Sequence, residues 1–273
     1  MASVHFARKY LRDELLPTAF CPGCGNGIVM NAFLKALNEL GYESLDGFAF
    51  VSGIGCGAWT ISPYFKADTL HTLHGRAIAY ATGLKIANPK LNVVVMSGDG
   101  DLSAIGGNHL MHAARRNMDL IVIMINNFIY GMTGGQVSPT TFENLTTTTT
   151  PYGNPDPPLD ASEVVAAAGA NYVARWTTAH VFPLIHSIKE ALKQEGFRFI
   201  EVISQCPTSF GRRIGKPDPD ELIRWFKTIS EMSKKGNIEL KDGSKIRIGK
   251  IIQRNRPGYI SRLKEIQNKA RSH

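Results

Sequence analysis

The fold is decided by two stretches, Val93-Val94-Val95-Met96-Ser97-Gly98-Asp99-Gly100-Asp101 and Ile121-Val122-Ile123-Met124-Ile125-Asn126-Asn127. Each begins with a continuous apolar run, which is typical of a strand covered by helices on both faces of a parallel sheet. Each run ends in polar residues. Because parallel strands end at the same edge of a sheet, the sequence predicts that Asp99 and Asn127 lie close together at that edge.

Apolar residues at helical or strand spacing alternate on both sides of these stretches. The pattern predicts strands at 48–51, 93–97, 121–126, 172–175 and 199–204, a long loop at 131–160, and helices at 26–40, 75–87, 104–117, 160–169, 179–195 and 221–234. This order predicts an α/β fold of the doubly wound type, with a mainly parallel sheet. We expect this domain to occupy residues 1–207 and a small basic C-terminal extension to occupy residues 208–273.

Length and composition limit the classes of protein to consider. The chain has 273 residues, of which 43% are hydrophobic and 20% charged, as in an ordinary globular protein. The apolar run at residues 120–125 is far too short to cross a bilayer, and the first ten residues lack the apolar segment of a secretory signal. We therefore expect a cytoplasmic protein with no membrane partner.

The charge is distributed unevenly along the chain, whose formal net charge is +8. Residues 1–207 carry 14 Lys and Arg against 16 Asp and Glu, whereas residues 208–273 carry 17 against 7. A basic tail can attract nucleic acid or an acidic protein, or it can face another subunit. Since no aromatic interleaving or nucleic-acid motif accompanies it, we expect no nucleic-acid partner.

The Gly98–Asp101 stretch is suited to binding a diphosphate. Its glycines let the backbone approach a phosphate, and the helix that follows offers free N–H groups at its positive end. Asp99 and Asn127 supply the hard oxygen ligands that Mg²⁺ prefers. Gly-Asp-Gly alone would be ordinary turn chemistry, but the Asn-Asn pair that ends the following strand completes a thiamine diphosphate signature.

All four cysteines lie in glycine- or proline-containing segments: Cys21 and Cys24 in Cys-Pro-Gly-Cys-Gly, Cys56 in Gly-Ile-Gly-Cys-Gly, and Cys206 in Gln-Cys-Pro-Thr. A reducing cytosol disfavours disulfides, and four thiolates from three segments can hold one iron–sulfur cluster. A structural Cys₄ zinc site and a thioredoxin-like dithiol are the alternatives. The two lone cysteines disfavour zinc, and the absence of a predicted strand just before Cys21 disfavours the dithiol.

With these motifs, residues 15–215 resemble the β subunit of 2-oxoacid:ferredoxin oxidoreductases. The resemblance rests on Gly98–Asp101, on Gly106-Gly107-Asn108-His109 and on the run from Asn126 to Gln136. It implies that Asp99, Asn127 and the backbone carbonyl of Ile129 bind Mg²⁺. It further implies one [4Fe–4S] cluster on Cys21, Cys24, Cys56 and Cys206, and thiamine diphosphate contacts at Ile54, Gly55, Cys56, Gly57, His74, Gly100, Asp101, Gly131 and Met132.

The resemblance also implies a reaction, the oxidative decarboxylation of a 2-oxoacid with coenzyme A as co-substrate and ferredoxin as electron acceptor. The segments that begin at Cys56 and His71, the Thr-Thr-Pro-Tyr-Gly segment and the Gly-Arg-Arg triplet are most similar to the 2-oxoglutarate type. Pyruvate and branched-chain 2-oxoacids are the alternatives. His74 is the predicted catalytic contact in this chain, and the candidates for binding the distal carboxylate of 2-oxoglutarate are Arg76, Arg212 and Arg213.

One part of a thiamine enzyme is missing from the chain. The glutamate that activates the cofactor normally lies on a pyrimidine-binding domain, and the chain has length for the diphosphate-binding domain alone. We therefore expect that glutamate on a partner α subunit, in a hetero-oligomer with two or more copies that can include further γ and δ subunits. A non-oxidative thiamine lyase would leave the cysteines incidental, and a zinc-stabilised nucleic-acid module would leave Gly-Asp-Gly and Asn-Asn unexplained.

Overall fold

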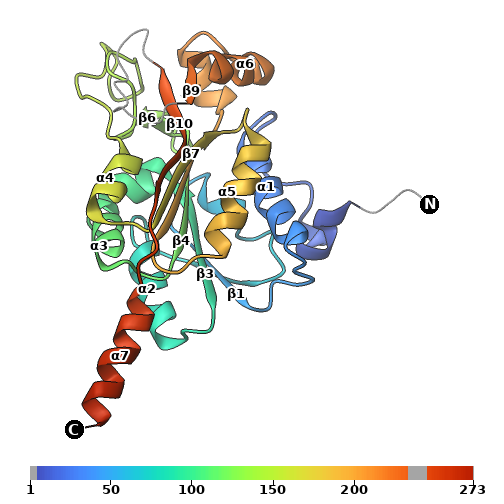
Figure 1. Cartoon of the computed structure of the whole chain (residues 1–273). Helices are drawn as coiled ribbons and strands as arrows, with labels where there is room; N and C mark the ends of the chain where they lie inside the picture. Colours follow the sequence, from blue (N-terminus) through green and yellow to red (C-terminus); the bar gives the residue numbers. More distant parts are fainter. Residues whose placement is uncertain (1–4, 233–244, 273) are drawn as a thin grey trace.

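An eight-stranded sheet forms the middle layer of the computed structural model, which describes residues 5–232 and 245–272 (Figure 1). The strand order is β2-β1-β3-β4-β8-β7-β10-β9. Neighbours from β2 to β7 run parallel, whereas β10 runs antiparallel to β7. The strands are β1 (Phe48–Ser52), β2 (Asp68–His71), β3 (Asn92–Gly98), β4 (Ile121–Asn126), β7 (Tyr172–Thr177), β8 (Arg198–Ile203), β9 (Ser230–Met232) and β10 (Ile246–Gln253), with β5 (Ile129–Tyr130) and β6 (Gln136–Val137) in a separate hairpin.

Helices cover both faces of the sheet, as the continuous apolar strands predict. Two lie on one face, α1 (Asn26–Glu39) and α5 (Val181–Leu192), and three lie on the other, α2 (Ala77–Ala87), α3 (Gly107–Arg116) and α4 (Ala161–Ala168) (Figure 1). Each layer of helices encloses its own cluster of buried apolar side chains. The remaining helices are α6 (Pro219–Ile229), α7 (Tyr259–Arg271), the 3₁₀ turns Phe6–Tyr10, Asp13–Leu15 and Ala58–Thr60, and the π-helical turns Gly100–Ile105 and Pro207–Gly211.

Several elements differ from the prediction. Strand β2 has no apolar pattern because it lies at the exposed edge of the sheet, where pairing with β1 orders it. The helix predicted at 104–117 is divided into a π-helical turn that begins directly after Asp99 and helix α3, which begins at Gly107. Helix α6 ends at Ile229 and strand β9 follows, while residues 233 and 234 of the predicted helix lie outside the described residues.

The basic C-terminal segment adds β10 to the main sheet and then forms α7, which projects away from the body of the molecule (Figure 1). Neither element was predicted. Asp119 holds the junction between them. Its Oδ1 accepts from Gly196 N (2.9 Å) and its Oδ2 accepts from Ile260 N (2.8 Å). This end of the sheet is therefore closed by hydrogen bonds between segments far apart in the sequence.

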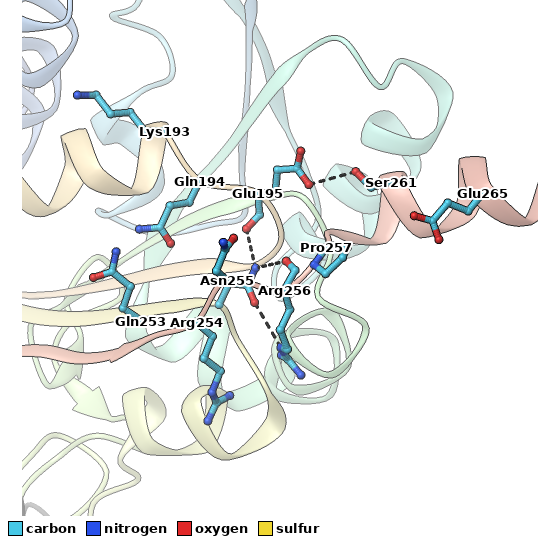
Figure 2. Close-up of a pocket in the computed structure, with 11 residues that line it drawn as sticks. Lys193, Gln194, Glu195, Gln253, Arg254, Asn255, Arg256, Pro257, Ser261 and Glu265 are labelled. Carbon is cyan, nitrogen blue, oxygen red and sulfur yellow. Dashed lines mark hydrogen bonds between the residues drawn. The ribbon is translucent and has the colours of Figure 1, made fainter.

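A polar groove of about 830 Å³ lies beside this junction, at the amino ends of β7 and β8 (Figure 2). The Asn171 amide donates to the carbonyls of Glu195 (3.0 Å) and Arg256 (2.7 Å), and Ser261 donates to the Glu195 carboxylate (3.1 Å). These polar groups fasten the C-terminal segment to the sheet. Within the described residues, no helix combines the length and apolar character needed to cross a bilayer.

Candidate active site

The polar residues that follow β3 and β4 meet at the carboxyl edge of the sheet. Gly98 pairs with Ile125 in the ladder, so Asp99 and Asn126 follow side by side. The Asn127 N–H lies 3.4 Å from Asp99 Oδ1 and donates to it. The structure therefore brings together the two residues that the sequence nominates as magnesium ligands.

Asp99 is almost completely buried, and hydroxyl groups surround its second oxygen. Ser138 Oγ donates to Oδ2 at 2.6 Å and Thr140 Oγ1 at 2.7 Å. Burial raises the pKa of this carboxyl to about 6, although hydrogen bonds from Ser138, Thr140 and the Asn127 N–H lower it. The protein thus keeps a carboxylate where its charge is poorly solvated, which is a favourable place for a cation.

The chain turns sharply after β4, and this turn positions Asn127. The Asn126 side-chain oxygen accepts from Phe128 N at 3.0 Å, and Phe128 adopts a left-handed backbone conformation with φ of 66°. Such a conformation is strained for a bulky residue and persists only where the surroundings impose it. Asn127 Oδ1 accepts from Ile129 N at 3.2 Å, so the amide and the Ile129 backbone lie in one short loop.

Asp101 organises the neighbouring backbone and His74. Its Oδ1 accepts from Ile54 N (3.1 Å) and Gly75 N (2.8 Å), and His74 Nδ1 lies 2.8 Å from the same oxygen. That contact with His74 lacks the angle of a hydrogen bond, and Asp101 Oδ2 is buried with no hydrogen-bond partner in the part of the chain that the structure describes. A methyl group on Gly53 would lie 2.1 Å from Oδ2, so only glycine fits there.

Tyr130 covers this part of the site. Its hydroxyl donates to the Gly100 carbonyl at 3.2 Å, and its ring centre lies 5.9 Å from that of His74. A side chain on Gly100 would collide with the Tyr130 ring, because a methyl group there would be 2.3 Å from it. Gly100, His74 and Asp101, which the sequence nominates as thiamine contacts, therefore lie in one neighbourhood.

Hydrogen bonds join the three cysteine-bearing segments. Gly25 N donates to the Gln205 carbonyl (3.0 Å) beside Cys206, and the Asn26 amide donates to the Cys56 carbonyl (2.8 Å). A methyl group on Gly131 would lie 3.7 Å from Cys56 Sγ and 3.9 Å from Cys206 Sγ. The thiols thus gather at the same sheet edge as Asn127, whose amide nitrogen would be 3.4 Å from that methyl group.

The thiols also interact electrostatically. Burial, together with the negative charges that the other three cysteines would carry, raises the pKa of Cys24 to about 12. Burial and the charges of Cys206 and Cys21 raise the pKa of Cys56 to about 11. Among residues 5–232 and 245–272, no three Cys, His, Asp or Glu side chains are arranged to hold a single metal ion. Four thiolates at this site would require a bound cationic group.

The other nominated side chains have different surroundings. Arg76 donates to the Ile105 carbonyl (3.1 Å) and lies 3.2 Å from His109. Burial and the positive charge of Arg76 lower the pKa of His109. His71 contacts Ser52 Oγ at 2.9 Å. Arg212 is exposed, whereas Arg213 packs against Gly135 and its buried Nε has no partner among the described residues.

Several residues of the site were not predicted. Ser138 and Thr140 come from the long loop at 131–160, whose sequence gives no sign that it folds back onto Asp99. Arg175 and Glu201, which form a buried ion pair, lie in the middle of strands that are mostly apolar. Charged residues inside buried strands are uncommon, so this pair left a signal that sequence reasoning overlooked.

Comparisons with known proteins agree with this geometry. A family model, the thiamine pyrophosphate enzyme C-terminal TPP-binding domain, matches residues 53–202. The 2-oxoglutarate synthase subunit KorB of Methanothermobacter marburgensis is 54% identical over 258 residues, covering 93% of this chain and 90% of the relative. A subunit of the same name from Methanocaldococcus jannaschii is 50% identical over 271 residues, covering 98% of this chain and the whole relative.

Among solved structures, the chain is similar to 2-oxoglutarate:ferredoxin oxidoreductase from Magnetococcus marinus with 2-oxoglutarate, coenzyme A and succinyl-CoA bound. The TM-score is 0.87 at 33% identity, with 98% of this chain and 92% of the other covered. The fold class and the family resemblance predicted from the sequence are confirmed. The chain belongs to the thiamine-diphosphate-binding subunits of the 2-oxoacid:ferredoxin oxidoreductase family.

Proposed function

We propose that the chain is the subunit of a 2-oxoglutarate:ferredoxin oxidoreductase that carries thiamine diphosphate, Mg²⁺ and a [4Fe–4S] cluster. One observation carries the cofactor assignment: the Gly131 position adjoins Asn127, Cys56 Sγ and Cys206 Sγ together. A diphosphate site and a cysteine set therefore share one edge of the sheet. The names of the most similar relatives favour 2-oxoglutarate over pyruvate and branched-chain substrates.

The residues present fit a magnesium diphosphate. Asp99 supplies a buried carboxylate, Asn127 an amide oxygen and Ile129 a backbone carbonyl, all from two adjacent strand ends. Gly100 lies at the start of the turn that follows Asp99, where it would face the phosphates together with Asp101, Gly131 and Met132. Ile54 to Gly57 and His74 would complete the contacts to the rest of the cofactor.

The cysteines fit a cluster better than a single ion, because among the described residues no three of them are arranged around one ion position. A zinc ion would draw four thiolates to about 4 Å from one another, since each lies about 2.3 Å from the metal. A cluster places inorganic iron and sulfide between the thiolates, so they need not touch. Bound thiamine diphosphate supplies the nucleophilic carbon for decarboxylation, and the cluster supplies one-electron transfer.

The same assignment requires a partner. Glu201 lies behind the site and is held by Asn126, Ser162 and Arg175. Among the described residues, no glutamate hydrogen-bonds to Asp99 or Asp101, and a thiamine enzyme needs a glutamate to activate the cofactor. We infer that an α subunit with a pyrimidine-binding domain provides it, and that coenzyme A and ferredoxin bind the assembled enzyme. His74, 37% exposed at the mouth of the site, would contact the substrate.

The proposed function is tested by kcat/KM for 2-oxoglutarate, pyruvate and 2-oxobutyrate. The chain co-expressed with its α subunit is expected to prefer 2-oxoglutarate, and the chain alone, even when loaded with cofactor, to show no turnover. We expect Arg213, whose buried Nε has no partner among the described residues, to bind the distal carboxylate, so an Arg213→Met variant should lose selectivity for 2-oxoglutarate. Full activity of the chain alone would contradict the partner requirement, and a preference for pyruvate would contradict the substrate.

A dependence on pH follows from the burial of Asp99. Protons compete with Mg²⁺ for this carboxylate, whose pKa is about 6, because a metal ligand must be deprotonated. We expect the apparent Mg²⁺ affinity to be constant above pH 7 and to fall about tenfold per pH unit below pH 6. Equilibrium dialysis of the complex between pH 5 and 8 measures this, and an affinity independent of pH would contradict Asp99 as a ligand.

A further inference from the structure

A buried ion pair connects the centre of the sheet to the proposed metal site. Glu201 of β8 lies directly opposite Arg175 of β7 in the parallel ladder, and both side chains are at most 4% exposed. Arg175 Nε donates to Glu201 Oε2 at 2.6 Å. Arg175 also contacts Asp160, the N-cap of α4, and its Nη1 donates to the Arg247 carbonyl (3.3 Å) of β10.

Glu201 accepts three hydrogen bonds and has no donor of its own. Two of them reach Oε2, from Arg175 Nε and from Ser162 Oγ at 2.6 Å. The third reaches Oε1, from the side-chain amide of Asn126 at 2.7 Å. Three donors therefore converge on one carboxylate, and an ionised carboxylate is the side chain that satisfies all of them.

The hydrogen bond to Glu201 fixes which way the Asn126 amide faces. Because its nitrogen points to Glu201, its oxygen points to the turn, where Phe128 N donates to it at 3.0 Å and Thr140 Oγ1 lies at the same distance. Thr140 Oγ1 is in turn 2.7 Å from Asp99 Oδ2. The Asn126 oxygen thus supports the left-handed turn at Phe128, while the single hydroxyl proton of Thr140 goes either to Asp99 or to Asn126.

We propose that Glu201 is a positioning residue for the metal-binding turn, acting through the orientation of the Asn126 amide. The proposal rests on the proposed magnesium site. If the amide turned over, its NH₂ would face the Phe128 N–H, and two donors would oppose each other at a strained turn. Asn127 follows directly in this turn, so its oxygen would leave the place from which it can reach a shared cation with Asp99.

Stability alone does not account for a charge at this position. A buried ion pair is often matched or exceeded in stability by apolar residues of similar volume. A positioning role does account for it, because only an acceptor-only group can hold the Asn126 nitrogen and the arginine together. Partners of this kind beyond the metal ligands typically change metal affinity about 10–100-fold when they are replaced.

The test is Glu201→Gln in the assembled complex, with Ser162→Ala as the matched control. The glutamine has the same shape but places an NH₂ group among three donors. Ser162→Ala removes one donor from Oε2 and leaves the Asn126 contact intact. We expect Glu201→Gln to weaken apparent Mg²⁺ affinity, measured as thiamine diphosphate retained in dialysis, about tenfold or more. Ser162→Ala should leave it unchanged, although both variants can lower Tm.

Two further variants separate the possible outcomes. Asn126→Asp combined with Glu201→Gln reverses donor and acceptor across this contact, so it should recover part of the lost affinity. Asp99→Asn should lose the cofactor if the metal site is where we propose. Given that loss, unchanged Mg²⁺ affinity in Glu201→Gln would overturn the positioning role, and so would an equal loss of affinity in Ser162→Ala. Retention of affinity in Asp99→Asn would show instead that the metal site itself is elsewhere, and the proposal would fall with it.

Discussion

Replacing Cys24 by serine is expected to bleach the protein. The complex purified without oxygen should be brown and contain about four irons per copy of this chain, as one [4Fe–4S] cluster requires. Cys24 is half-buried and follows the turn in which its N–H donates to the Cys21 carbonyl at 3.0 Å. A serine hydroxyl ionises far less readily than a thiol and is a poor ligand to iron, so most iron and the transfer of electrons to an acceptor should be lost.

Cys24 tests the cluster more selectively than Cys56 does, because Cys56 is also a predicted thiamine contact. In Cys24→Ser, thiamine diphosphate retention should remain, because the diphosphate ligands belong to other segments. Iron content, the visible absorption spectrum and bound thiamine diphosphate are to be measured on the same sample. A colourless wild-type protein that holds one zinc ion would contradict the cluster, and loss of both cofactors together would indicate general unfolding.

The central strands of the sheet could be predicted because burial on both faces gives them continuous apolar sequences. β3, β4 and β8 are buried at nearly every position, and each was located to within one or two residues. β2 and β10 could not be predicted from such apolar runs. Their residues are partly exposed, and their order depends on the backbone of β1 and β7, which no local pattern records.

The same distinction applies to the candidate site. Asp99 and Asn127 could be brought together from the sequence, because parallel strands end at a common edge. The residues that form hydrogen bonds around Asp99 and Asn126 could not be predicted in this way. Ser138 lies 39 positions beyond Asp99, and Glu201 lies 75 positions beyond Asn126, so these contacts depend on the path of a long loop and on the strand order. Neither follows from periodicity, which reports only the local element.

Asp99→Asn is expected to abolish thiamine diphosphate retention without unfolding the chain. The substitution removes the one charged ligand of the proposed magnesium site, and Mg²⁺ binds hard anionic oxygens. The amide keeps the size of the carboxyl and an oxygen that can accept from Ser138 and Thr140, which now donate to Asp99. Cofactor bound after dialysis should fall by about 100-fold or more, as expected when a primary ligand is lost rather than a residue behind it.

The fold should tolerate this change, because a buried carboxylate without a bound cation destabilises the folded chain. The pKa of Asp99 is about 6 in the folded chain and exceeds the ordinary value of 3.8. Above pH 6 the ionised Asp99 therefore lowers the free energy of unfolding. A difference of this size corresponds to about 3 kcal/mol, which would be relieved as the pH falls from about 6 to 4. In the absence of Mg²⁺ and thiamine diphosphate, Asp99→Asn should therefore unfold at a temperature equal to or above that of wild type at pH 7.

Asp119→Asn provides the matched control at the opposite edge of the sheet. Asp119 is also buried, but its two oxygens accept backbone N–H groups at 2.9 and 2.8 Å that close the C-terminal junction, whereas the Asn127 N–H lies 3.4 Å from Asp99 Oδ1. An amide nitrogen there would face a donor, so this variant should lower Tm and keep its cofactor affinity, the reverse of Asp99→Asn. Thermal unfolding with and without Mg²⁺ and thiamine diphosphate distinguishes the two patterns. If Asp99→Asn retained the cofactor as well as wild type does, the diphosphate would have to be bound away from this edge of the sheet.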